Sequence, residues 1–206
     1  MRRLTLALTL SLLGACAGAA EQARALSGFN AIDIRGPINL QVEAGKAHSV
    51  RVIGDDKFFK RVTTDVVNGK LRIDMDESHT STSDNERVVV TVPQLQQFSG
   101  AGAGVAQLSN ISGERFVVDY KGAGRLVISG KVKQLKLSAK GVGEVDTRNL
   151  VAQDADVDFK GVGSVKVHAT DKLNADVKGI GELLYYGRPR VVNKTAGGLG
   201  SVSAGD

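Results

Sequence analysis

The chain has 206 residues, 42% of them hydrophobic, so it is long enough for one domain with a substantial core. Only 4% are aromatic and Trp is absent, which predicts a core of aliphatic side chains. Without Arg2 and Arg3, 25 Lys and Arg residues face 22 Asp and Glu residues, a balance of +3. A charge this small and this dispersed predicts no binding to nucleic acid.

The first 25 residues predict export. Arg2 and Arg3 form a basic start, residues 4–13 form an uncharged apolar run, and residues 14–20 are all small. This order is typical of a secretory signal peptide, and the apolar run is too short to span a membrane.

Two cleavage sites fit this leader. Residues 13–16 read LGAC and resemble a bacterial lipobox, so cleavage before Cys16 would leave that residue to carry a lipid anchor. Residues 23–25 read ARA and fit ordinary cleavage after Ala25. The first case predicts a membrane-anchored protein of the outer membrane or periplasm, and the second a periplasmic or secreted one. Cys16 is the only Cys, so no disulfide is expected.

Residues 26–206 are predicted to form one folded domain made of strands. In its first half, apolar and polar residues alternate with the period of a strand at 32–34, 38–42, 50–52, 71–73 and 88–92. These segments are expected to form the opening coils of a stack. The polar stretch 76–86 has no such pattern and predicts a loop.

The second half repeats a short glycine motif, Gly-x-Gly. Its second glycine falls at positions 104, 124, 143, 163, 181 and 200, at intervals of 18 to 20 residues. Alternating segments precede and follow each copy, so each motif is predicted to be a corner where Gly adopts conformations denied to other residues. Self-similarity at a fixed period of this length is the sequence signature of a solenoid.

Stacking the copies in register places apolar residues in shared inward columns. The chain therefore predicts an all-β, single-domain parallel β-helix with coils of about 19 residues, stacked at about 4.8 Å. A leucine-rich repeat would need helix-compatible segments and an Asn ladder, neither of which is expected here. The three predicted inward columns are Phe116, Leu135, Ala155 and Leu173; Val118, Leu137, Val157 and Ala175; and Leu126, Val145, Val165 and Leu183.

The sequence resembles a bacterial family of unknown function, the autotransporter-adhesin head domain known as the GIN domain. The resemblance covers about residues 28–202 and rests on GFNAI at 28–32, NGKLRI at 68–73, VTVPQL at 90–95, the repeated glycine motif and YYGRP at 185–189. It implies a right-handed parallel β-helix in the cell envelope. It implies no reaction, since the family brings no catalytic residues to carry over.

One outer column is a candidate binding site. In register, Lys121, Lys140, Lys160 and Lys178 stack at about 4.8 Å. Two positions earlier lies a balancing column of Asp119, Ser138, Asp158 and Asp176. Two interpretations stay open: the paired rows keep a flat face soluble, or the lysines bind an anion such as an envelope glycan or anionic lipid headgroups.

The sequence carries no recognisable catalytic, cofactor or metal motif. His48, His79 and His168 are scattered, and Asp154, Asp156 and Asp158 lack the Gly and Glu of a calcium loop. We predict a non-enzymatic cell-envelope module, an adhesin or ligand-binding protein, with no cofactor and with self-association left open. The alternative is a polysaccharide lyase or hydrolase on the same scaffold.

Overall fold

The computed structural model describes residues 20–75 and 85–205, which form one 11-stranded sheet and one short helix. The all-β prediction is confirmed. The described part contains no helix with the length and apolar character needed to cross a membrane. In chain order the elements are β1 (Ala20–Arg24), β2 (Ala31–Arg35), β3 (Leu40–Ala44), β4 (Ser49–Gly54), α1 (Asp56–Arg61), β5 (Val62–Val67), β6 (Lys70–Met75), β7 (Arg87–Val92), β8 (Gln97–Ala101), β9 (Ala103–Tyr120), β10 (Ala123–Tyr186) and β11 (Val191–Ala204).

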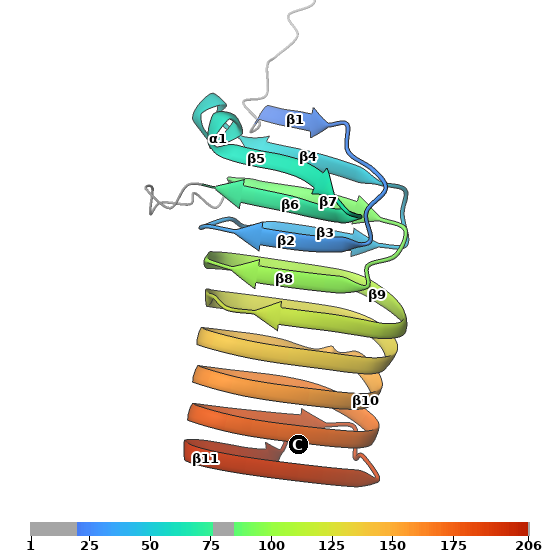
Figure 1. The fold of residues 1–206 in the computed structure, drawn as a ribbon, viewed down its shortest axis with the longest axis vertical. Coiled ribbons are helices and arrows are strands. Elements are labelled where there is room, and N and C mark those ends of the chain that lie inside the picture. The colour runs from blue at the N-terminus through green and yellow to red at the C-terminus, as the bar shows by residue number, and fades with distance from the viewer. Residues whose placement is uncertain (1–19, 76–84, 206) are drawn as a thin grey trace, which may run out of the picture.

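The long strands wind into a stack of flattened coils, and each coil pairs in parallel with the next (Figure 1). Ala123 of β10 lies beside Ala103 of β9, and Lys172 of β10 lies beside Val191 of β11. These partners are 20 and 19 residues apart in the chain, which matches the repeat period of the sequence. The coils therefore stack one repeat above another.

The N-terminal end departs from the prediction that every early segment forms an opening coil. There β1 pairs antiparallel with β4, β4 with β7, and β5 with β6. The β5–β6 hairpin has a physical cause in its turn, where Asn68 and Gly69 adopt φ of 51° and 73°. An Asn-Gly pair with two positive φ angles is the preferred two-residue hairpin connection.

Strand β1 begins at Ala20, ahead of the predicted domain start at residue 26. Its five residues pair with β4, and the Arg24 guanidinium donates to the Phe59 carbonyl at 3.0 Å. Helix α1 covers the same end, where the Asp55 carboxylate caps it by accepting from Phe58 N at 2.7 Å. Phe58 is fully buried, so strand and helix together close this end of the core.

The core follows the predicted columns. Every one of the twelve residues assigned to the three inward columns is at most 4% exposed. The register is well specified because a shift by one residue would turn each of these side chains to solvent.

The glycine motifs bend the chain without interrupting the ladder. Gly143 and Gly163 have φ of 143° and 136°, as the corner assignment requires. Strand β10 nevertheless runs through them as one element of 64 residues, so the corners are bends inside a strand and not loops between strands. At each of these two positions an added Cβ would lie 2.0 Å from the carbonyl oxygen of the glycine one coil earlier. Only glycine therefore fits at this spacing.

At the opposite end, β11 forms the last described coil. Lys194 pairs in register with Ala175 and so occupies an inward column. Its ammonium group donates to the Val202 carbonyl at 3.3 Å, and Val202 aligns with buried Leu183 on the other wall. The lysine side chain therefore spans the end of the core.

Candidate functional site

The structure brings the four predicted lysines together on one outer column. Ala139 pairs with Tyr120, which places Lys140 directly beside Lys121. Each following lysine precedes a glycine that stacks on the glycine of the coil before, Gly161 on Gly141 and Gly179 on Gly161. The column ends at Lys178, whose partner in β11 is Gly197.

Three of these lysines are paired with the balancing aspartates. The nitrogen–oxygen distances are 3.0 Å for Lys121–Asp119, 2.9 Å for Lys160–Asp158 and 2.7 Å for Lys178–Asp176. The hydrogen bond that the Lys178 ammonium donates to the Asp176 carboxylate raises the pKa of Lys178. These pairs are solvent-exposed, so each contributes only about 0–1 kcal/mol to stability.

Lys140 is the exception, because Ser138 stands where its carboxylate would be. Lys140 makes no ion pair within residues 20–75 and 85–205, although it lies between two other lysines. The three aspartates each hold their lysine through one oxygen, and the other oxygen, Oδ1, is buried without a hydrogen-bond partner in the described part of the chain. The uncompensated positive charge of the column is therefore centred on Lys140.

An acidic and basic pair that the sequence does not predict is formed by Asp146, which is buried, and Arg148. Asp146 is 5% exposed and accepts from the Arg148 guanidinium at 2.7 Å and from the Arg148 backbone N at 3.1 Å. These hydrogen bonds lower the pKa of Asp146. The guanidinium carbon of Arg148 also lies 5.9 Å from the centre of the Tyr186 ring. Residues 145–147 are buried in succession, which interrupts the in-and-out alternation of the strand.

Polar side chains on the outer face are linked from coil to coil near the C-terminal end. Asn193 donates to Asn174 at 2.9 Å, and Asn174 donates to Asp156 one coil earlier. These bonds are exposed and join two Asn residues and one Asp, so they leave the argument against a leucine-rich repeat unchanged.

The histidines considered as possible metal ligands or bases do not come together in the described residues. His48 Nε2 lies 2.8 Å from the Phe29 carbonyl oxygen, and His168 Nδ1 lies 3.1 Å from the Arg148 carbonyl oxygen. Within the residues that the structure describes, no three His, Cys, Asp or Glu side chains are grouped to hold a metal ion. Cys16 and His79 lie outside those residues.

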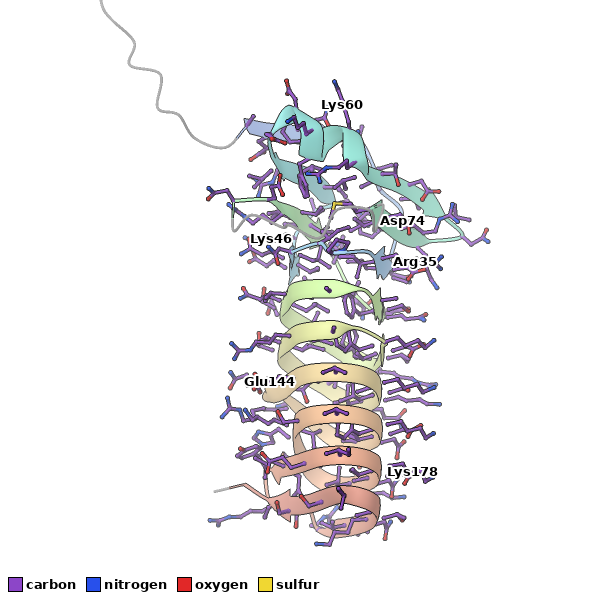
Figure 2. All side chains as sticks on the ribbon, turned by 90° about the vertical axis from the view of Figure 1, so that its left-hand side faces the viewer. Arg35, Lys46, Lys60, Asp74, Glu144 and Lys178 are labelled. Atoms are coloured by element: carbon purple, nitrogen blue, oxygen red, sulfur yellow. The ribbon has the colours of Figure 1, made fainter. Side chains whose placement is uncertain are left out.

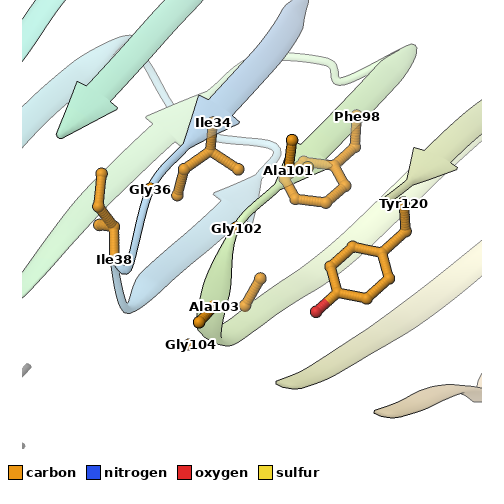
Figure 3. A pocket seen from close by; sticks show the side chains of 11 residues that line it. Ile34, Gly36, Ile38, Phe98, Ala101, Gly102, Ala103, Gly104 and Tyr120 are labelled. Carbon is orange, nitrogen blue, oxygen red and sulfur yellow. The ribbon is translucent and has the colours of Figure 1, made fainter. Parts of the chain in front are cut away.

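The stack of coils contains a small cavity and, elsewhere, a surface groove. A cavity of ≈ 20 Å³ lies at the first glycine corner, between Ile34 and Ile38 on one side and Phe98 and Tyr120 on the other (Figure 3). It has room for about one water molecule. Burial there raises the pKa of the Tyr120 hydroxyl.

The surface groove has a volume of ≈ 540 Å³ and lies across β3, β4, β7, β9 and β10. Its volume lies within the range of about 300–1,000 Å³ typical of small-molecule sites. Gln41 and Gln107, which are register partners on β3 and β9, both line it. Lys46 and Glu43 also line it, and the Lys46 ammonium pairs with the Glu43 carboxylate at 2.8 Å.

Stacked coils with paired charges outside and an aliphatic core define an all-β module of repeated architecture. The chain belongs to the family described as "Putative auto-transporter adhesin, head GIN domain", which matches residues 28–189. The resemblance read from the sequence is thereby confirmed. Membership indicates an exported protein of the cell envelope, and the family brings no evidence of enzymatic activity.

Solved structures support the fold. A "putative adhesin" from Bacteroides fragilis has a TM-score of 0.74 at 22% identity, covering 91% of this chain and 97% of that one. "Putative adhesin" structures from Parabacteroides distasonis and Parabacteroides merdae have TM-scores of 0.53 and 0.52 at 18% and 16% identity, covering 92% and 93% of this chain and 98% of each of theirs. At these identities the likeness concerns the fold alone. No curated protein matches the chain.

Proposed function

We propose that this chain is a non-enzymatic binding module of the cell envelope, built as a right-handed parallel β-helix with coils of about 19 residues. Its binding site is the outer column of Lys121, Lys140, Lys160 and Lys178. The observation that carries the proposal is the stacking of these lysines, with Lys140 making no ion pair within the described residues 20–75 and 85–205.

The column suits an extended anion. Neighbouring ammonium groups about 4.8 Å apart repel by about 0.9 kcal/mol in water, and an anion that bridges them relieves this repulsion. A polymer or surface with regularly spaced negative charges can meet several coils at once. Acidic envelope glycans and anionic lipid headgroups both have this character, and binding to either would account for an adhesive role.

The anchor proposed for this module is a lipid on Cys16. Cleavage before Cys16 keeps β1 in the mature protein, whereas cleavage after Ala25 removes a strand that pairs along β4. Lipidation would place the module at the outer membrane or in the periplasm, and its absence would make it periplasmic or secreted.

Replacing Lys140 and Lys160 with Gln tests the anion site. The variant should bind an anionic polysaccharide such as alginate less tightly, and the lost part should be the part that added salt removes from the wild type. The matched control replaces Lys57 and Lys60 of α1 with Gln, which changes net charge equally at the far end of the molecule. Equal, salt-insensitive binding by all three proteins would reject the site.

A second candidate, a polysaccharide lyase or hydrolase, is favoured by the surface groove, which amide and charged side chains line together. If it were correct, purified protein would turn over pectin, alginate or a glycosaminoglycan, and Lys46→Gln with Arg51→Gln would abolish turnover. Absence of turnover on these substrates would remove this candidate and leave the binding module.

A further inference from the structure

An exposed aliphatic ridge runs along one edge of the coil stack. It consists of the middle residue of each glycine motif, and in most soluble proteins such side chains are buried. Val142 is 59% exposed, Ile180 55% and Leu199 78%, although all three belong to well-paired strands. The ridge comprises Ala103, Ala123, Val142, Val162, Ile180 and Leu199.

The register makes these residues one continuous feature. Ala123 pairs with Ala103, and Ile180 pairs with Leu199. The glycines on both sides have no side chains, so each aliphatic group stands clear of its own coil. Figure 2 looks onto this edge and shows short carbon-only side chains down the middle of the coils, with Glu144 and Lys178 projecting on opposite sides.

Charge is layered beside the ridge. In four of the six coils the lysine column lies two residues before the ridge, and in three of these four the paired aspartate lies two residues further away. Ala101 and Gly197 take the lysine position beside Ala103 and Leu199. Moving outward from the ridge on this flank, the surface of the three coils with a paired aspartate is therefore aliphatic, then basic, then acidic. On the other flank Glu144 is neutralised by Arg125 at 3.3 Å and by Lys166 at 2.7 Å, while Glu182 is exposed.

The dimensions favour a surface over a folded partner. Five steps of about 4.8 Å make a ridge about 24 Å long and one side chain wide, on the order of 250 Å². A stable protein interface buries about 800 Å² on each partner, so a second copy would find too little contact. A lipid surface needs only shallow apolar insertion combined with attraction of Lys to anionic headgroups.

We infer that the ridge docks the protein side-on to an anionic lipid bilayer, with the aliphatic side chains in the headgroup region and the lysine column against the headgroups. This inference rests on the proposed anion site and names its partner. Docking should be strongest toward the C-terminal coils, because the ridge side chains grow from Ala103 and Ala123 to Ile180 and Leu199.

The test compares two matched double variants of residues 20–206, which contain every described strand and carry neither leader nor acyl group. Val142→Ser with Ile180→Ser shortens the ridge, and Val67→Ser with Val191→Ser changes two exposed valines elsewhere. Binding is measured by co-sedimentation with vesicles of phosphatidylglycerol and phosphatidylcholine, and to soluble alginate. The ridge variant should lose at least about tenfold in vesicle affinity, since burial of each aliphatic group is lost. Its alginate binding should be unchanged.

A single-tryptophan probe gives a second readout, because the chain has no Trp of its own. Fluorescence of Val162→Trp should shift to the blue on anionic vesicles, whereas that of Val67→Trp should not. Vesicle binding by the ridge variant equal to wild type, or no shift for Val162→Trp, would overturn the inference. Alginate binding by a wild type that ignores vesicles would also overturn it while leaving the anion site intact. Unaltered alginate and vesicle binding by the Lys140 and Lys160 variant would instead reject the anion site, and with it the basic half of the docking surface.

Discussion

A glycine can be required because an added Cβ would clash or because its φ is positive. Four glycine-to-alanine substitutions separate the stability effects of these two causes. At Gly163 both act, because φ is 136° and an added Cβ would lie 2.0 Å from the Gly143 carbonyl oxygen. At Gly161 only contact acts, with the Gly141 oxygen at 2.2 Å and an ordinary φ. At Gly28 only conformation acts, since φ is 75° and no atom lies within 4 Å. Gly197 has neither constraint, and its nearest atom is 4.0 Å away.

The magnitudes follow from these distances. Ordinary contact begins at 3.4 Å, so at Gly163 the neighbouring coil must give way by about 1.4 Å. That shift weakens two or three ladder hydrogen bonds worth about 1 kcal/mol each. The positive φ adds about 1–3 kcal/mol. We expect losses of about 3–6 kcal/mol for Gly163→Ala, about 2–3 for Gly161→Ala, about 1–2 for Gly28→Ala, and none for Gly197→Ala.

Guanidinium unfolding followed by far-ultraviolet circular dichroism measures these free energies. Hydrogen exchange of amides in β10 reports loosening confined to neighbouring coils, as expected where each repeat contacts only the next. If Gly163→Ala were as stable as Gly197→Ala by both measures, the close stacking of coils at the corners would be wrong.

Three further predictions concern the ends and the buried acid. Cys16→Ser should release the protein from membrane fractions and abolish lipid labelling, and a wild type that is already soluble and begins at Leu26 would contradict the anchor. Deleting residues 20–25 should lower the melting temperature, because β4 loses one of its two neighbouring strands and keeps only β7, and the Phe59 carbonyl loses its donor; an unchanged transition would show that β1 adds nothing. The pKa of Asp146 is depressed when folded, so its contribution is complete above the unfolded pKa and is lost as pH falls through the folded one. Asp146→Asn should therefore flatten the acid side of the stability profile, and identical profiles for both proteins would exclude this role.

The inward columns could be predicted from the sequence because each coil repeats a short alternation of apolar and polar residues. This alternation determines which face of the strand is buried. The prediction failed at the N-terminal end for a different reason. A strand pattern does not say whether its partner runs parallel or antiparallel, and only the Asn68-Gly69 turn pointed to a hairpin. Strand β1 was missed because its residues follow directly on a leader and resemble a cleavage site.

Part of the candidate site could also be predicted from the sequence. The stacking of the lysines and the neighbouring aspartates followed from register alone. The exposed ridge could not be predicted in the same way, because the middle residues of the glycine motifs lie at corners, between the alternating segments. The burial of Asp146 beside Arg148 could not be predicted, because it depends on a local break in the alternation at residues 145–147.

The position of Lys194 bears on whether further chains can add to the open end of the coil stack. Among the described strands, β11 pairs only with β10, so it presents a free parallel edge of the kind on which further chains can add to form fibres. A copy that stacked there would cover the ammonium group of Lys194, which is exposed, and would cost that charge part of its hydration. Lys194 would therefore oppose the addition of a further chain at this edge, as inward-pointing charges do on the edge strands of other sheets.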